Sequence, residues 1–410
     1  MEAIVKRSCG LDVHKKIIVG TILLEQEDGS VIEETREFGT THKECQILSA
    51  WLVEHQIELT VMESTGIFWK NIYAALEEKG LRVSVVNARH VKQVPGKKTD
   101  VKDSAWLARL ARYGLLKGSF IPPKDLRELR LIARYRTKCV RMLASEKNRL
   151  HKVLDDAGVR LGNVVSDING VSAEEIINGL IKGEPIEKLL TYTRGVLKNK
   201  KEALRAELEA PLSARHLFLL SRLHSHIEYL KKELQNLDDT LFLAMAPYQE
   251  QWQLLQTIPG ISDIAAALLI IEMGVDMHAF GSREQFCSWA GMCPGNNESA
   301  GKKKSGKTRK GSTQLKYVLC ESAHAATKTE CQFKQKYKSL LIRRGHKKAI
   351  VASGHKMLRV IYSVLTRGKP YNDPEIDYEQ FVVNKNSSRW VKMLKKYGYI
   401  DPEKPNLTYC

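Results

Sequence analysis

Four acidic side chains in the first 103 residues have the types and spacing that metal-assisted chemistry needs. Asp12 lies within a β-forming run, and Glu63 ends a short apolar run, the position at which α/β sheets place their sites. Asp100 and Asp103 lie at the start of a helical pattern at i and i+3, so they share one helix face. Hard oxygen ligands select Mg²⁺ or Mn²⁺, which suit phosphoryl transfer. Taken singly, Asp100 could cap its helix and Asp12 could be a charge at a strand edge.

A second group of reactive side chains lies in a segment rich in glycine and lysine, residues 293–311. Ser299 stands at its entrance, where a hydroxyl could attack a bound phosphodiester and hold a covalent intermediate. On the local pattern alone, a serine in such a loop is more often a hydrogen-bonding partner of a phosphate. From Ala300 to Lys316 there are seven Lys/Arg and no acid. Six of them are expected to contact nucleic acid: Lys302, Lys303, Lys304, Lys307, Arg309 and Lys310.

A third feature is the turn Thr257-Ile-Pro-Gly-Ile-Ser262, which opens the apolar helix expected over 264–272. Backbone N–H groups at such a turn can bind phosphate, and the pattern resembles a helix-hairpin-helix motif for the DNA backbone. Pro-Gly turns also begin ordinary helices, so the pattern alone leaves both readings open.

The elements that must position the carboxylates alternate between strand and helix patterns over residues 8–116. Strands are expected at 10–14, 17–24, 31–38, 59–62 and 83–86, and helices at 42–55, 67–78 and 100–116. The resulting order, βββαβαβα, is that of the ribonuclease H-like fold. We therefore expect an α/β domain over residues 1–121.

Residues 122–245 change character after the Pro122-Pro123 break. Apolar positions predict a long helix from about 126 to 157, and a second helix has heptad spacing at Leu220, Leu223, Ile227, Leu230, Leu234, Leu237 and Leu241. Three heptads predict a coiled coil that joins protomers, or else a helix packed within its own domain. The first helix has ten Lys/Arg against three acids between 124 and 152, which favours contact with a nucleic-acid backbone through Arg130, Arg134 and Arg141.

Composition limits the class of protein. The 410 residues contain 65 Lys+Arg and 47 Asp+Glu, a net charge of +18, so nucleic acid is the leading partner. No apolar run is long enough to cross a bilayer, and the first sixteen residues have no apolar core typical of a signal peptide. Eight cysteines without a C-x-x-C pair predict reduced thiols and a cytoplasmic location. A third, helical and basic part is expected over 246–372, and a peripheral tail over 373–410.

Together these blocks resemble a known family. Gly10-Leu-Asp-Val-His14, Met62-Glu-Ser-Thr-Gly66 and Lys98-Thr-Asp-Val-Lys-Asp-Ser104 are similar to three motifs of the DEDD transposases of bacterial insertion sequences, the family numbered 110. Pro294-Gly-Asn-Asn-Glu-Ser-Ala-Gly301 and the Ile258-Pro-Gly turn are similar to its C-terminal transposase domain. The resemblance covers residues 8–330, with a mild departure at Lys310-Gly311-Ser312, where the family often has Asn after the glycine.

The resemblance implies a RuvC-type nuclease fold, a coiled-coil insertion and a mainly helical serine-bearing domain. It implies a site-specific DNA recombinase, guided by a structured RNA from the element and acting as a dimer or tetramer at the bacterial nucleoid. Asp12, Glu63, Asp100 and Asp103 match the family's metal-binding tetrad, and Ser299 matches the serine that bonds to DNA. Two alternatives remain open: a RuvC-type junction endonuclease that hydrolyses with water, and a non-catalytic nucleic-acid scaffold.

Overall fold

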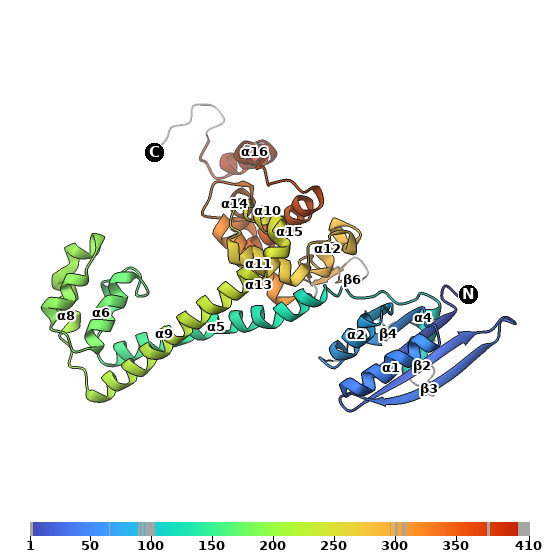
Figure 1. Cartoon of the computed structure of the whole chain (residues 1–410). Coiled ribbons are helices and arrows are strands. Elements are labelled where there is room, and N and C mark those ends of the chain that lie inside the picture. The colour runs from blue at the N-terminus through green and yellow to red at the C-terminus, as the bar shows by residue number, and fades with distance from the viewer. Residues whose placement is uncertain are drawn as a thin grey trace. The chain divides into compact units, whose positions relative to one another are not determined.

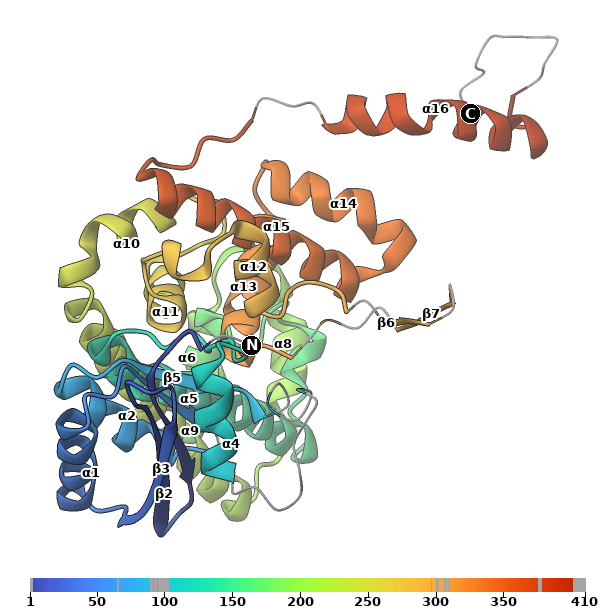
Figure 2. The ribbon, with the colours of Figure 1, turned by 90° about the vertical axis from the view of Figure 1, so that its right-hand side faces the viewer.

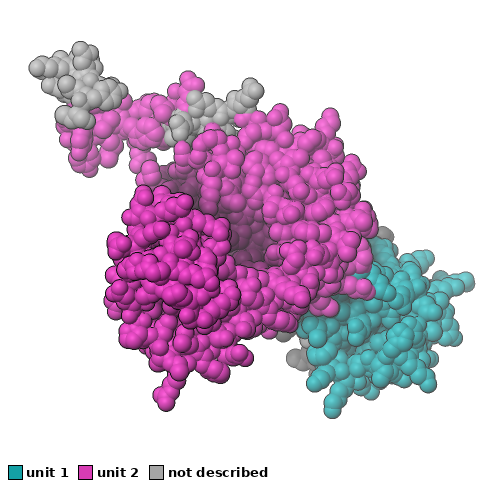
Figure 3. Space-filling view, turned by 60° about the vertical axis from the view of Figure 1, so that its left-hand side comes forward, with its two compact units in different colours: residues 1–124 teal, residues 125–410 magenta. Residues whose placement is uncertain are grey.

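The computed structural model in Figure 1 describes residues 3–64, 66–88, 91, 94, 103–295, 297–299, 302–305, 308, 310–374 and 378–400. The chain divides into two compact units, Met1–Lys124 and Asp125–Cys410, which Figure 3 colours separately. The boundaries expected near residues 245 and 372 stay predictions.

The first unit is built on a five-stranded mixed sheet. Its strands are β1 (Arg7–Val13), β2 (Ile17–Glu25), β3 (Val31–Gly39), β4 (Leu59–Glu63) and β5 (Val83–Val86), in the spatial order β3-β2-β1-β4-β5. Strands β1, β2 and β3 pair antiparallel, whereas β4 is parallel to both β1 and β5. The helices are α1 (His42–Glu54), α2 (Trp69–Glu78) and α4 (Asp103–Arg112). The strands and helices predicted for this part of the sequence are therefore present, in the expected order.

Each face of this sheet is covered by different helices. Leu11 and its alternate neighbours on β1 point into a core with α1 and α2, which includes Leu48 and Ile72. The opposite face packs on α4, where Val61 of β4 meets Leu107. Alternation along a strand thus assigns every residue of β1 and β4 to either the α1/α2 side or the α4 side.

Helix α4 approaches β1 unusually closely at Gly10. A Cβ placed on Gly10 would lie 2.1 Å from the backbone oxygen of Ser104 and 2.4 Å from the backbone nitrogen of Ala108. The Ser8 hydroxyl, on the same face, donates a hydrogen bond to the Ala108 carbonyl at 3.0 Å. Only glycine permits this backbone-to-backbone contact, so the glycine of the first motif fixes how near α4 lies to β1.

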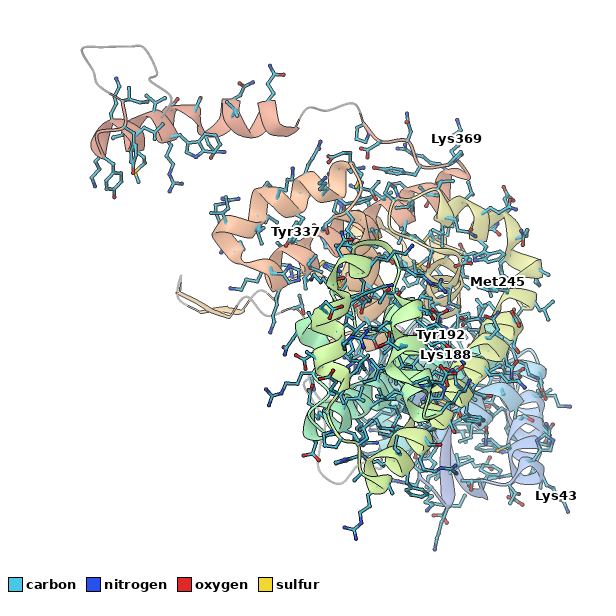
Figure 4. The ribbon with its side chains drawn as sticks, turned by 90° about the vertical axis from the view of Figure 1, so that its left-hand side faces the viewer. Lys43, Lys188, Tyr192, Met245, Tyr337 and Lys369 are labelled. Atoms are coloured by element: carbon cyan, nitrogen blue, oxygen red, sulfur yellow. The ribbon has the colours of Figure 1, made fainter. Side chains whose placement is uncertain are left out.

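The second unit contains two long helices joined at one end by a cap of short helices. Figure 1 shows α5 (Lys124–Asp156) and α9 (Ala214–Leu243) side by side, and an ion pair between Arg136 and Asp238 links them, with Nη2 3.0 Å from Oδ2. The cap elements are η1 (Leu161–Asn163), α6 (Val171–Ile181), α7 (Ile186–Leu189), η2 (Leu190–Tyr192), η3 (Gly195–Lys200) and α8 (Lys201–Leu208). In Figure 4 Lys188 and Tyr192 lie together in this cap, and each donates a 2.8 Å hydrogen bond to Glu184.

Five of the seven heptad positions of α9 are buried inside the chain itself. Leu220, Leu223 and Ile227 share one apolar cluster with Leu150 and Leu154 of α5 and with the cap helices. Leu230 and Leu241 are also buried. The prediction that this seam joins protomers is therefore corrected: the alternative, a helix packed within its own domain, accounts for these five heptad positions.

The remaining helices of the second unit form a bundle, except for the last, 378–396, which lies beside it (Figure 2). They are η4 (Ala246–Tyr248), α10 (Gln249–Gln256), α11 (Asp263–Met273), η5 (His278–Phe280), α12 (Arg283–Trp289), α13 (Thr313–Ala326), α14 (Gln332–Arg344), α15 (His346–Arg367) and α16 (Tyr378–Lys396). A hairpin of β6 (Asn297–Ser299) and β7 (Lys302–Ser305) connects α12 to α13. Helix α11 is buried from Ala266 to Met273, because every residue of this stretch except Glu272 is apolar.

Among the helices of the described ranges, none is long and apolar enough to cross a membrane. The seven cysteines in those ranges are all free thiols, as the absence of a disulfide-type spacing predicted.

Gly10→Ala is expected to destabilise the first unit, because the new methyl group would force α4 away from β1. Overpacking of this kind costs about 1 to 3 kcal/mol or more. Urea unfolding followed by circular dichroism measures the effect. Gly162→Ala is the matched control, since a Cβ there meets no atom within 4 Å. Equal stability of both variants would mean that the approach of α4 is not tight.

Ile227→Ala is expected to lower the free energy of unfolding by about 2 to 4 kcal/mol, because it empties part of a buried cluster within the chain. Sedimentation should show the same oligomeric state as the parent. Leu219→Ala, on an exposed position of the same helix, should change stability by less than about 1 kcal/mol. If Ile227→Ala dissociated an oligomer without lowering the free energy of unfolding, the seam would instead lie between protomers.

Candidate functional site

Two of the predicted carboxylates lie side by side on neighbouring strands. Strands β1 and β4 run parallel with Leu11 opposite Met62, so Asp12 and Glu63 occupy the next position of the same register. Parallel neighbours in a sheet lie about 4.8 Å apart. Asp12 alternates with Leu11, and Glu63 with Met62, both of which belong to the α1/α2 core. Both carboxylates therefore belong to the face that α4 covers.

Asp103 is the first residue of α4, and that end of the helix lies over β1 and β2. The Ser104 hydroxyl is 2.8 Å from the Thr21 hydroxyl of β2, and Thr21 is paired with Gly10 in the sheet. Gly10 precedes Asp12 by two residues on β1, so the contact at Gly10 places the start of α4 near Asp12. Three of the four predicted carboxylates come to one face of the sheet, whereas Asp100 lies outside the described residues.

Asp12 has a protein partner that the sequence motif did not identify. The Asp12 carboxylate is 27% exposed, and its Oδ2 lies 3.0 Å from Nε2 of His14. His14 follows the end of β1 on the same face as Asp12, a relation that the i, i+2 spacing alone could have revealed. This histidine orients one carboxylate oxygen and leaves the other for a second partner.

The donor chemistry of this face suits a hard divalent cation. Asp12, Glu63 and Asp103 supply carboxylate oxygens, which Mg²⁺ and Mn²⁺ prefer. Within the described ranges, no three His, Cys, Asp or Glu side chains are grouped closely enough to hold a metal ion. The metal prediction therefore depends on the shared face and on the type of ligand.

The serine predicted as nucleophile lies on a short β-hairpin. In the backbone register Ser299 of β6 is opposite Lys302 of β7, and a further bridge joins Pro294 to Thr308. Figure 2 shows the hairpin extending from the helical bundle. The strand that faces Ser299 carries three lysines: Lys302, Lys303 and Lys304. Lys310 is exposed, whereas Lys307 and Arg309 lie outside the described residues.

The base of this hairpin is fixed by backbone contacts and one buried acid. A Cβ on Gly311 would lie 2.5 Å from the carbonyl oxygen of Ala290, so glycine is required there. Ser312 accepts a hydrogen bond from the Leu315 amide as the N-cap of α13, and its hydroxyl donates to Oε2 of Glu272 at 3.2 Å. The departure from the family pattern at Ser312 therefore supplies a helix cap.

The basic face predicted on α5 is partly used within the protein. Nε of Arg130 donates a 3.2 Å hydrogen bond to the carbonyl of Ile271 and lies 3.7 Å from the Glu272 carboxylate. Nη2 of Arg134 lies 3.3 Å from the same carboxylate. Burial lowers the pKa of Arg130, and the charge of Glu272 opposes that shift. Arg141 lies over the Tyr317 ring at 5.5 Å. Both guanidinium groups thus have an internal partner in Glu272, and the Arg134 side chain is also 45% exposed. Contact of these arginines with nucleic acid stays a prediction.

The Pro-Gly turn also has an internal role. It joins α10 to α11, as the motif predicted. Gly260, at φ +87°, packs against α13. A Cβ on this residue would lie 2.2 Å from the Ser322 carbonyl oxygen. The Ser262 hydroxyl accepts a hydrogen bond from the Ala265 amide at the start of α11. Close helix packing therefore explains this glycine without a phosphate.

Comparison with known proteins agrees with this arrangement. A family model for DEDD transposases of the IS110 type matches residues 9–158, and a model described as transposase of the IS116/IS110/IS902 family matches residues 252–338. The first segment contains all four predicted carboxylates, and the second contains Ser299 with its lysines.

Three relatives are transposases. The chain is 25% identical over 330 residues, 77% of its length, to the transposase for insertion sequence element IS1111A of Coxiella burnetii, of which the match covers 80%. It is 28% identical over 205 residues, 48% of its length, to a putative transposase of Sinorhizobium fredii, and the match covers 51% of that protein. The transposase for IS1328 of Yersinia enterocolitica is 28% identical over 188 residues, 45% of this chain and 55% of that protein.

The two family models match separate segments: the first contains the carboxylate face, and the second contains the serine hairpin. The chain therefore belongs to the IS110 family of transposases, enzymes that act on DNA.

Proposed function

We propose that this transposase cleaves and rejoins DNA strands at specific sites by metal-assisted phosphoryl transfer through a phosphoserine intermediate. The observation that carries the proposal is the register of β1 and β4, which aligns Asp12 with Glu63 on the sheet face where α4 begins at Asp103. Two strand positions and one helix start thus contribute acids from separate parts of the sequence to one face. A buried or structural role would not require three carboxylates at this place.

The carboxylates would act as ligands of Mg²⁺ or Mn²⁺, with Asp100 as the fourth. When bound, the metal neutralises charge on the attacked phosphate. Asp12, Glu63 and Asp103 hold the ligand oxygens on rigid elements, and His14 fixes the orientation of the Asp12 carboxylate. The strand order β3-β2-β1-β4-β5 is compatible with the proposed RuvC-type, ribonuclease H-like fold.

Ser299 is proposed as the nucleophile. Its hydroxyl oxygen bonds to the phosphorus of the scissile phosphodiester, the bond from phosphorus to the leaving strand oxygen breaks, and that oxygen takes up a proton. The hydroxyl of a second strand then attacks the same phosphorus and releases Ser299. One phosphodiester is exchanged for another, so rejoining needs no ATP. The lysines of β7 would neutralise the phosphates on either side.

A structured guide RNA and an oligomer complete the proposal. The net charge of +18 supports a second polyanionic partner beside DNA, and the family resemblance points to an RNA encoded by the element. Because α9 buries positions 220–230 within its own chain, a dimer or tetramer at the nucleoid would need another contact surface.

Asp12→Asn is expected to reduce strand cleavage in Mg²⁺ by more than about 100-fold, because several kcal/mol of transition-state stabilisation depend on a complete ligand set. Affinity for DNA, measured by fluorescence anisotropy, should stay within about twofold. Asp28→Asn removes an equal charge at the exposed β2–β3 turn and should cleave normally. Full cleavage by Asp12→Asn would overturn the metal assignment.

Ser299→Ala is expected to abolish both recombination and a covalent protein–DNA adduct trapped with denaturant. Mass spectrometry of the parental adduct should place the nucleotide on Ser299. Ser305→Ala, in the facing strand of the same hairpin, should keep the adduct. Strand cleavage without an adduct in the parent would favour the hydrolytic junction endonuclease, and unchanged recombination by Ser299→Ala would make the serine a phosphate contact only.

A further inference from the structure

The helical hairpin α14–α15 carries a strong positive charge that no part of the proposed site uses. From Cys331 to Asn372 the sequence has no acid and eleven Lys/Arg. The match to the transposase family model ends at residue 338, before most of this segment. In Figure 2 the two helices pack against each other at the edge of the bundle.

The charge is concentrated at the turn between the helices. Residues 341–348 are all exposed, and Gly345 at φ +73° makes the reversal sharp. Tyr337, labelled in Figure 4, shares a 2.8 Å hydrogen bond with Nδ1 of His346, so the two sides of the turn are held together. The turn therefore presents its side chains to solvent from a fixed backbone.

Four cations of this turn have no ion-pair partner among the residues that the structure describes: Arg343, Arg344, Lys347 and Lys348. Neighbouring cations on the same two helices do have partners, since Lys334 pairs with Glu330 and Arg359 with Glu284. Lys336 and Arg367 of the same helices also lack an ion-pair partner among the described residues, but the turn brings four such cations together within six positions, all of them exposed.

Helix electrostatics explain only two of these four residues. Arg343 and Arg344 end α14, where the negative end of the helix dipole favours cations. Lys347 and Lys348 lie in the first turn of α15, which contains no acid, and there the positive end of the dipole disfavours them. Two lysines kept at an unfavourable position and without internal partners indicate an external anion.

An exposed apolar side chain stands among these charges. Ile342 is 95% exposed, one of the most exposed large apolar residues described, and it directly precedes Arg343 and Arg344. A branched apolar side chain flanked by cations is the arrangement by which proteins insert a wedge between base steps while they neutralise the phosphates.

We propose that the α14–α15 turn is a separate binding element for duplex DNA, in which Arg343, Arg344, Lys347 and Lys348 contact phosphates and Ile342 contacts a base step. The element goes beyond the proposed strand chemistry and does not depend on Ser299 or the carboxylates.

Helix α15 connects this element to the serine hairpin. Nε2 of His355 lies 3.8 Å from Sγ of Cys293 at the base of the hairpin, and Gly354 lies close to Met292. Eight residues of helix separate Lys347 from His355, a length of about 12 Å. Burial, Arg359 and Lys336 lower the pKa of His355, in keeping with a positive environment along this helix. One duplex can therefore contact both the turn and the hairpin.

The test measures DNA binding by the full-length protein in EDTA, where strand cleavage is absent, so a failure of the proposed chemistry would not affect it. The variant replaces Arg343, Arg344, Lys347 and Lys348 with alanine. Four lost phosphate contacts should reduce the slope of log K against log salt concentration by about 3 to 4 and weaken binding about tenfold or more near 0.1 M salt. The matched control replaces four exposed cations that lack ion pairs in the described structure: Lys198, Lys201, Arg215 and Lys232.

The control removes the same total charge, but at positions outside the proposed element. Its slope of log K against log salt concentration should therefore change by less than about 1. Equal slopes for the two variants would overturn the proposal, because net charge alone would explain the effect. A loss of affinity for structured RNA with unchanged affinity for duplex DNA would overturn it too, since the occupant would be RNA.

Ile342→Ala tests the base-step contact. Parental protein should raise the fluorescence of 2-aminopurine in the duplex as a base is unstacked, and Ile342→Ala should lose that rise. Val196→Ala, at another highly exposed apolar position, is the control and should retain it. A rise that survives in Ile342→Ala would remove the isoleucine from the proposed contact.

Discussion

The contact between α4 and β1 at Gly10 is the constraint on which the carboxylate face depends. A helix normally packs on a sheet through side chains, which keep the two backbones apart. Here a carbonyl oxygen of α4 lies 2.1 Å from the place where the Cβ of any other residue would stand, and the Ser8–Ala108 hydrogen bond holds the helix there. The beginning of α4 is thereby brought to the end of β1 that carries Asp12. A more distant helix would separate Asp103 from the strand carboxylates and leave no common face.

In the second unit a single buried acid has a comparable importance. Glu272 is 3% exposed, and it joins α5, α11 and the N-cap of α13 through Arg130, Arg134 and Ser312. Removing one partner of such a group leaves an uncompensated buried charge, which typically costs about 3 to 5 kcal/mol. Because Ser312 ends the segment that begins with the β6–β7 hairpin, the same network fixes one end of the catalytic loop proposed here.

The positive charge of the chain has two distinct uses. Part of it is internal, as in the pairs of Arg130 with Glu272 and Arg136 with Asp238. Another part, at the α14–α15 turn, is exposed and has no ion-pair partner among the described residues. Net charge predicts a polyanionic partner, but only the ion pairs distinguish the cations that stabilise the fold from those that remain for a ligand.

The sequence by itself determined the order of strands and helices in the first unit, because alternation and helical periodicity are local properties of the chain. It also identified Asp12, Glu63 and Asp103 as candidates, since each lies at a recognisable point of such an element. It did not determine that Asp12 and Glu63 are aligned, which depends on the parallel register of β1 and β4. Nor could it tell that the heptads of α9 pack inside the chain or that Arg130 pairs with Glu272, 142 positions away in the sequence. Periodicity and charge show which face of a helix is apolar or basic. The tertiary structure alone decides which groups that face contacts.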